Sequence, residues 1–242
     1  MATAAGFADH ALVLRTSAYG EADLVVDLLT ADHGRVAVLA RSARSSRRRF
    51  GGALEIGVRL QVRIAPSRGL PALSDCDVVG VLQAVRTDLR RIAHLSYVLE
   101  ITRLFSKEGE RDAPLFGLVT AFIDALEAAP ASDEALALWE LGVLAHLGYG
   151  LKLGPCLITQ GRAEALSLAA GGAVARGAAP DAEPVPPEAL GVLARLTRGE
   201  VDAQFRPEDE APVRHAFARI WARLAGRTLR SALFLLPPQD PV

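Results

Sequence analysis

The sequence predicts an α+β protein in which a five-stranded OB-fold barrel is followed by an all-helical domain. Two patterns lead to this prediction: apolar residues recur at strand spacing as far as about residue 82, and at helical spacing after residue 86. The length agrees, because 242 residues, at about 150 per domain, make one large or two modest domains. We therefore expect a barrel domain over residues 1–85 and a helical domain over residues 86–242.

The N-terminal part contains five short runs rich in Val, Leu and Ile, separated by turn residues such as Gly20, Gly34 and the segment 66–69. The segment 60–64 alternates apolar and polar residues, as a half-buried strand does. Five short strands with a longer arginine-rich connection between the third and the fourth are typical of a small closed barrel. The predicted strands cover residues 11–16, 23–30, 34–40, 59–64 and 73–81.

The second part shows helical periodicity. Leu115, Val119 and Phe122 fall on one face of a helix, and Ser132 is expected to cap the N-terminus of the next one. Residues 154–186 are rich in Ala, Gly and Pro without a period, so we expect an irregular, poorly ordered excursion there. The predicted helices cover residues 87–108, 112–129, 132–147, 187–197 and 208–225.

Composition excludes several classes of protein. Half of the residues are apolar and 23% are charged, which rules out long disorder. Two cysteines, Cys76 and Cys156, can form neither a disulfide framework nor a four-ligand zinc site, and this favours a reducing compartment. The N-terminus lacks an export signal, and no run reaches the roughly 18 apolar residues of a membrane span. We expect a soluble cytoplasmic protein without a membrane partner.

Charge is unevenly distributed along the chain. Residues 35–68 hold nine arginines against the single acid Glu55, a balance of +8, although the whole chain sums to −1. Such a cluster in a small barrel is typical of polyanion binding. The alternative is a solvated loop that only keeps the protein soluble, but Arg59 and Arg63 share one strand face, which favours binding. The candidate nucleic-acid-binding residues are Arg35, Arg41, Arg44, Arg47, Arg48, Arg49, Arg59 and Arg63.

Aromatic content limits the mode of binding. Residues 1–85 hold only Phe7, Tyr19 and Phe50 as aromatic residues, too few for a platform that stacks successive bases. Phosphate contacts should therefore dominate, and affinity should be modest, nearly independent of sequence and sensitive to salt.

Signs of catalysis are missing from the sequence. The five histidines are scattered, and acid groups such as 208–210 open predicted helices, where the helix dipole favours them. No phosphate-binding loop, dinucleotide fingerprint or nucleophile elbow occurs. We expect no catalytic residue, cofactor or metal.

Three sequence blocks occur in the order in which a known family has them. The first comprises residues 11–16, 21–30, 33–36 and 43–46, the second Trp139-Glu140-Leu141 through Gly150, and the third residues 229–234. Together they resemble the RecO family of bacterial recombination mediators and DNA repair proteins.

The resemblance implies a function in DNA repair and recombination. It implies that the chain binds single- and double-stranded DNA, anneals strands, and helps load recombinase onto single strands coated by single-strand-binding protein. The partners implied are RecR, RecF and single-strand-binding protein, and the place is the cytoplasmic nucleoid of a bacterium. None of these activities requires a reaction centre.

The sequence departs from the family pattern in two places. Many relatives carry two C-x-x-C pairs, which here would fall at Cys156 with Thr159 and at Ala175 with Ala178; one sulfur of four remains, so no zinc is expected. Some relatives also place arginines ahead of the aromatic-Glu-Leu motif, where residues 135–138 have none. The site for the acidic tail of single-strand-binding protein is then either lost or moved to helix arginines such as Arg90, Arg91 and Arg103.

Two other functions are alternatives to the mediator. An adaptor that keeps the fold and the protein partners but has lost DNA affinity is favoured by the missing zinc ligands and the few aromatic residues. A metal-dependent nuclease is more distant, because no carboxylate cluster supports it. Oligomeric state and preference for single or double strands are left open by the sequence.

Overall fold

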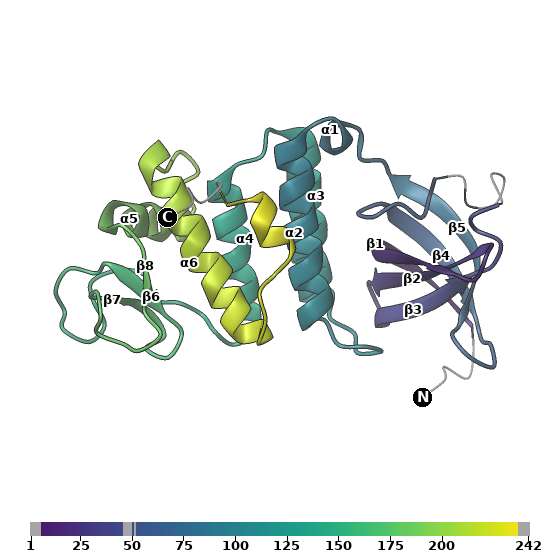
Figure 1. Ribbon diagram of the computed structural model, residues 1–242, viewed down its shortest axis with the longest axis horizontal. Helices are drawn as coiled ribbons and strands as arrows, with labels where there is room; N and C mark the ends of the chain where they lie inside the picture. Colours follow the sequence, from purple (N-terminus) through teal and green to yellow (C-terminus); the bar gives the residue numbers. More distant parts are fainter. Residues whose placement is uncertain (1–5, 46–49, 51, 237–242) are drawn as a thin grey trace. The chain divides into compact units, whose positions relative to one another are not determined.

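The computed structural model describes residues 6–45, 50 and 52–236 (Figure 1). The chain forms two compact units, one made of residues up to 89 together with 98–128, the other of residues 90–97 together with those from 129 onward. The long helix α2 (Leu89–Phe105) contributes to both. The expected domain boundary at residue 85 stays a prediction.

The first unit contains the predicted barrel. Its five strands are closed in the order β1-β2-β3-β5-β4, with β3 and β5 parallel and all other neighbours antiparallel. β1 is longer than expected, because its first half pairs with β4 and its second half with β2. The strands are β1 (Phe7–Tyr19), β2 (Asp23–Thr30), β3 (Gly34–Ala40), β4 (Arg59–Ala65) and β5 (Ala72–Gly80).

Alternation along the strands places the core inside the barrel. On β4, Leu60, Val62 and Ile64 are buried, whereas Gln61 and Arg63 point outward and are exposed. Phe50, in the β3–β4 connection, is buried in the same core and is therefore not available to a ligand. The outer face of β4 is thus polar and cationic.

The helices α1 and α3, together with part of α2, complete the first unit. The one-turn helix α1 (Gln83–Arg86) precedes α2. Helix α2 itself starts later and ends earlier than the helix predicted over residues 87–108. Glu127 of α3 (Ala113–Ala128) accepts hydrogen bonds from the backbone N–H groups of Gln83, Ala84 and Val85, which satisfies the free N-terminal donors of α1.

The second unit is helical, with a small sheet. Helix α4 (Asp133–His146) is capped as predicted, because the Ser132 hydroxyl accepts from the Ala135 N–H at 3.2 Å. Helix α5 (Pro187–Thr197), helix α6 (Pro207–Ala225) and a 3₁₀ turn, η1 (Ser231–Phe234), follow. Within the described residues, no helix is both long and apolar enough to cross a membrane.

The irregular excursion predicted over residues 154–186 is wrong. A three-stranded sheet of order β7-β6-β8 forms there from β6 (Ala165–Ser167), β7 (Gly172–Val174) and β8 (Glu183–Pro184). Strands of two or three residues, of which β6 and β7 are buried along their whole length, are too short to show a period in the sequence. Gly172 is required here, since a Cβ would lie 2.1 Å from the Lys152 carbonyl oxygen.

Candidate nucleic-acid interface

The β3–β4 connection begins with two of the predicted arginines. Arg41 is exposed and makes no hydrogen bond or ion pair among the described residues. The Arg44 guanidinium donates to the Glu21 carbonyl oxygen at 3.0 Å, and the Ser42 N–H donates to Asp23 at 2.7 Å. These bonds tie the start of the connection to the β1–β2 turn. Arg47, Arg48 and Arg49 lie outside the described residues.

The two arginines predicted on β4 differ in their surroundings. Both point outward, but Arg59 forms an ion pair with Asp124 of α3 at 2.6 Å. The Arg63 side chain is exposed, and its guanidinium forms no hydrogen bond or ion pair with a described residue, although Asp75 lies opposite it on β5. On the outer face of β4, the Arg59 guanidinium is therefore paired within the protein, whereas the Arg63 guanidinium is available to a ligand.

Arg35 holds the barrel to the loop after α2. Its guanidinium donates to the Ser106 carbonyl oxygen at 3.4 Å and lies 3.5 Å from an Asp27 carboxylate oxygen and 3.9 Å from one of Glu108. The backbone N–H and C=O groups of Arg35 also bond to Lys107 and Gly109. Of the five predicted arginines that the structure describes, Arg41 and Arg63 are available to a ligand.

A cluster of buried charges in the second unit was not predicted. Arg214 of α6 lies with its Nη1 2.7 Å from Oε2 of Glu140 on α4, and neither side chain is exposed to more than 3%. Oε1 of Glu140 accepts from the Tyr97 hydroxyl at 2.8 Å and from Nε1 of Trp221 at 3.2 Å. Because α2, α4 and α6 supply these groups from distant parts of the chain, no sequence spacing could reveal them.

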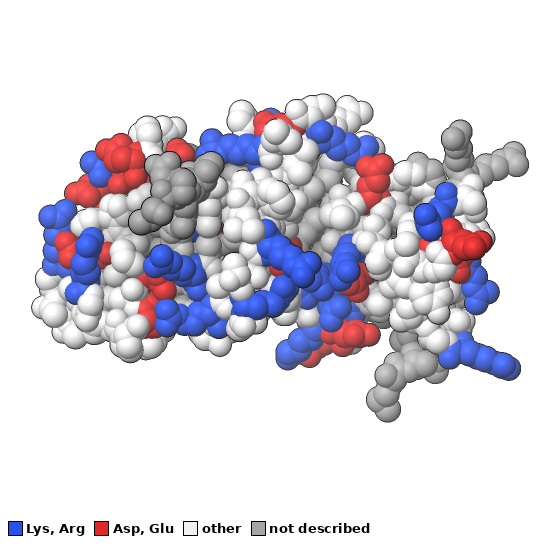
Figure 2. All heavy atoms as spheres, in the orientation of Figure 1, with Lys and Arg blue, Asp and Glu red and all other residues white. Residues whose placement is uncertain are grey.

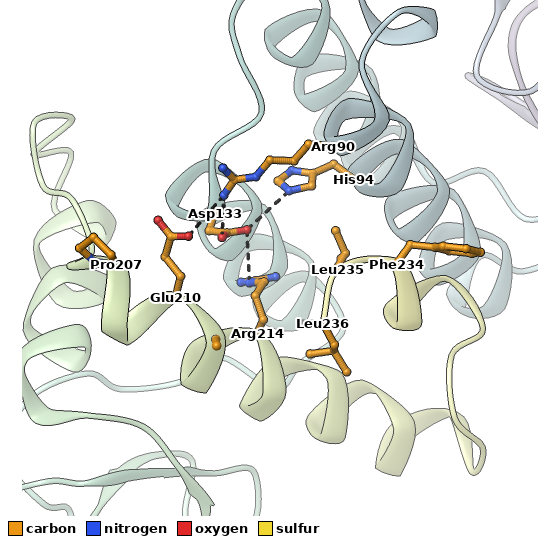
Figure 3. A pocket seen from close by; sticks show the side chains of 10 residues that line it. Arg90, His94, Asp133, Pro207, Glu210, Arg214, Phe234, Leu235 and Leu236 are labelled. Atoms are coloured by element: carbon orange, nitrogen blue, oxygen red, sulfur yellow. Dashed lines mark hydrogen bonds and ion pairs between the residues drawn. The ribbon is translucent and has the colours of Figure 1, made fainter. Parts of the chain in front are cut away.

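Asp133 continues this cluster toward the surface (Figure 3). Its carboxylate lies 2.9 Å from Arg90, 3.5 Å from His94 and 3.8 Å from Arg214. Burial alone would raise the pKa of Asp133, but His94 and the two guanidinium groups outweigh it, and the pKa is lowered. In the folded protein Asp133 is therefore a carboxylate.

A cavity of about 410 Å³ opens beside these side chains. Figure 3 shows Arg90, His94 and Arg214 on one side and Phe234, Leu235 and Leu236, from the C-terminal segment, on the other. Nε, Nη1 and Nη2 of Arg214 are buried and have no hydrogen-bond partner among the described residues. The cavity is thus lined by cationic side chains next to an apolar wall, a combination suited to an amphiphilic anion.

Cys156 lies where the resemblance described above predicts the first zinc ligand. The residue is fully buried, and its Sγ accepts the backbone N–H groups of Ala175 at 3.0 Å and Thr159 at 3.4 Å. Hydrogen bonds from the Thr159 side chain and from these backbone groups lower the pKa of the thiol from 9.0 to about 7. Thr159, Ala175 and Ala178 cannot supply the other three ligands of a structural zinc site, so the residues present do not fit the metal.

The fold defines a protein with an OB-type barrel and a helical unit. Two family models match the chain: "Recombination protein O N terminal" over residues 5–82 and "Recombination protein O C terminal" over residues 86–231. The chain belongs to the RecO family of DNA repair proteins.

Curated relatives agree with this assignment. A DNA repair protein RecO of Myxococcus xanthus is 35% identical over 234 residues, covering 94% of this chain and 96% of the relative. Another from Anaeromyxobacter dehalogenans is 38% identical over 229 residues, covering 92% and 86%. A third, from Anaeromyxobacter sp. strain K, is 40% identical over 194 residues, covering 77% and 76%.

Proposed function

We propose that this chain is a non-enzymatic mediator of DNA repair and recombination. It binds DNA without sequence preference, anneals complementary strands, and helps load recombinase onto single strands coated by single-strand-binding protein. The observation that carries the proposal is the +8 balance of residues 35–68 on an OB barrel, with exposed guanidinium groups at Arg41 and Arg63 that pair with no carboxylate in the described part of the chain.

Phosphate contact is the binding mode that this surface supports. Phe50 is buried in the barrel core, and Phe7 stacks on His33 with ring centroids 3.8 Å apart. These contacts reduce further the small number of aromatic rings on which a base could stack. Guanidinium groups that bind phosphates carry no sequence information. We expect similar affinity for single strands of different sequence and a steep loss of affinity with salt.

The proposed protein partners are RecR, RecF and single-strand-binding protein, and the proposed location is the bacterial cytoplasm at the nucleoid, without a membrane partner. The cavity beside Arg214 supports one of these partnerships. An acidic tail that ends in a hydrophobic residue could place its carboxylates at Arg90 and Arg214 and its apolar end against Phe234 and Leu235. Arg91 and Arg103, the other candidates for this tail, stay predictions.

An adaptor without DNA affinity is the second candidate. It is favoured by Arg35, Arg44 and Arg59, which all donate to groups of the protein itself. Fluorescence anisotropy with a labelled oligonucleotide across a salt series separates the two functions. The mediator predicts binding at physiological salt with a negative slope of log affinity against log salt, and the adaptor predicts no binding.

A further inference from the structure

One residue of β3 lacks a backbone partner on the side away from β2. The Arg35 N–H donates to the Lys107 carbonyl oxygen at 3.2 Å, on that side of the strand. The Leu39 N–H donates there to the Pro71 carbonyl oxygen at 2.8 Å. Since backbone groups of alternate residues on a strand point to the same side, those of Ala37 also point away from β2. In the described part of the chain they bond to no group on that side, and this position is called here the Ala37 gap.

The chain itself keeps the Ala37 gap open. A parallel ladder continued from the pairing at Leu39 would need residue 71 to donate to the Ala37 carbonyl oxygen, but Pro71 has no N–H. At the other end the bridge from Glu108 stops at Gly109, whose φ of +71° is incompatible with an extended strand. The protein occupies both ends of the gap, so a compact group can reach Ala37 more easily than an extended peptide running along β3.

A cavity of about 750 Å³ lies at the Ala37 gap, within the first unit. Leu70, which is 39% exposed, belongs to its lining. Apolar walls with a small number of backbone donors and acceptors are typical of a ligand pocket. The apolar side chains of the lining are those of Phe7, Val36, Leu70 and Pro71.

The charged residues of this cavity disfavour an anion. They are Asp32, Glu108 and Arg111, and the Arg111 guanidinium already lies 2.9 Å from an Asp32 carboxylate oxygen. Figure 2 shows basic and acidic side chains side by side over the loop that follows α2. The cavity therefore suits a neutral group that carries one hydrogen-bond donor and one acceptor.

Nucleobases have this chemistry. Each of the four bases is neutral and planar and carries a donor beside an acceptor on its Watson–Crick edge, and proteins that hold an unstacked base read this edge between apolar side chains. Ala37 offers the complementary pair, an N–H donor and a carbonyl acceptor. Because every base has such an edge, this contact selects no sequence, which agrees with the proposed function.

Arg68 favours a base carried by a strand over a free nucleoside. It directly precedes Gly69 and Leu70 of the lining. Its side chain is exposed and forms no hydrogen bond or ion pair with a described residue. A guanidinium group at the border of a pocket that itself disfavours anions suits a phosphate attached to the bound base.

We propose that the Ala37 gap holds one base of the strand bound by the barrel, with the base against Leu70 and Pro71 and its phosphate at Arg68. This inference rests on the proposed function and adds a base contact to the phosphate contacts. Since the Watson–Crick edge of the held base is then engaged, the contact favours single strands over duplex.

The first test compares strands that have the same phosphates. Oligo-dT and an abasic strand of equal length carry equal charge, so phosphate contacts alone would give equal affinity. We expect wild type to bind the abasic strand about tenfold more weakly, because two hydrogen bonds and an apolar contact are lost. The two salt slopes should be equal. A strand of N3-methylthymidine keeps the ring but lacks the donor for Ala37, and it should bind as weakly as the abasic strand.

The second test uses variants of the pocket. A37P removes the N–H and places the proline ring in the gap; since that N–H makes no ladder bond, the barrel should fold, which the melting temperature checks. A37P should bind both strands with equal affinity, and L70A should reduce the difference between them. V79A is the matched control and should keep the wild-type difference, because Val79 is 54% exposed on β5 and lies outside the lining.

The outcomes separate this inference from the proposed function. Equal affinity of wild type for oligo-dT and the abasic strand would overturn the base pocket alone, and the gap would then suit the side-chain amide of a protein partner. A wild-type difference in both A37P and L70A would overturn it too. Millimolar thymidine should leave the affinity for oligo-dT unchanged, and displacement would mean that the ligand is a free nucleoside. Failure of wild type to bind either strand would overturn the proposed function as well.

Discussion

Arg214 and Glu140 form an ion pair in the interior of the second unit, with Nη1 and Oε2 2.7 Å apart. Arg214 belongs to α6 and Glu140 to α4, and the Arg214 guanidinium also lies over the Phe217 ring at 5.4 Å from its centroid. Desolvation of both charges is costly, so the pair depends on good geometry and on the extra donors Tyr97 and Trp221. The packing of α4 against α6 is therefore set by a polar contact as well as by apolar ones.

Breaking this pair should be strongly destabilising. We expect R214A to lower the free energy of unfolding by about 3–5 kcal/mol, because Glu140 would remain buried without its counter-charge. The double variant E140Q/R214M should recover most of the loss, since Gln keeps an acceptor for Tyr97 and Trp221 and Met fills the space of Arg214. Urea unfolding of the three proteins measures these differences. Equal stability of R214A and wild type would contradict the prediction.

Asp133 should make stability depend on acid pH. Its pKa in the folded protein lies below the ordinary value of 3.8, so its contribution is present above about pH 4 and is lost as the pH falls further. We expect D133N to be less stable than wild type at pH 7 by about 1–3 kcal/mol, with a difference that shrinks below pH 4. D202N is the control, because the Asp202 side chain is 82% exposed. A difference that stays constant with pH would argue against a charged Asp133.

Arg47, Arg48 and Arg49 should contribute to DNA affinity through charge. Their replacement by alanine together should flatten the salt slope on single strands by roughly two units, at about 0.7 for each contact, and weaken all sequences alike. The same variant should lose strand annealing. The control R111A/R162A/R198A removes three paired arginines and should keep the slope. An unchanged slope in a folded R47A/R48A/R49A protein would make the adaptor the better interpretation.

Purified protein should contain no stoichiometric zinc, because Thr159, Ala175 and Ala178 stand where three thiolates would be needed. Elemental analysis after dialysis measures this. The triple variant T159C/A175C/A178C has four thiols in this region, including that of Cys156. It is the positive control, and we expect it to retain one zinc per chain. One zinc per chain in the unmodified protein would refute the prediction.

Cys156 should stabilise the small sheet more strongly at alkaline pH. Since its folded pKa is depressed to about 7 from 9.0, the stabilisation is complete above pH 9 and is lost as the pH falls through 7. The melting temperature of wild type should therefore rise relative to that of C156A between pH 7 and pH 9. Parallel curves for the two proteins would mean that Sγ stays protonated throughout.

Local patterns of the sequence were enough to predict the five barrel strands and the long helices. The alternation of residues 60–64, the cap at Ser132 and the period through Leu115, Val119 and Phe122 each depend on neighbours within a few residues, and the structure confirms them. The prediction was wrong over residues 154–186, because each strand there is stabilised by distant contacts. Leu157 bonds to Ala173, and Ser167 bonds to Asp181 at 2.5 Å.

By itself the sequence determined the barrel, the helical unit and the local excess of arginine, because strand and helix periods and charge counts are properties of short segments. Only the tertiary structure decided which arginines remain available. Arg59 is neutralised by Asp124, 65 residues away along the chain, and Arg214 is buried against Glu140, whereas Arg63 and Arg230 stay exposed. An ion pair depends on distance in space, and spatial neighbours far apart along the chain leave no mark in local composition.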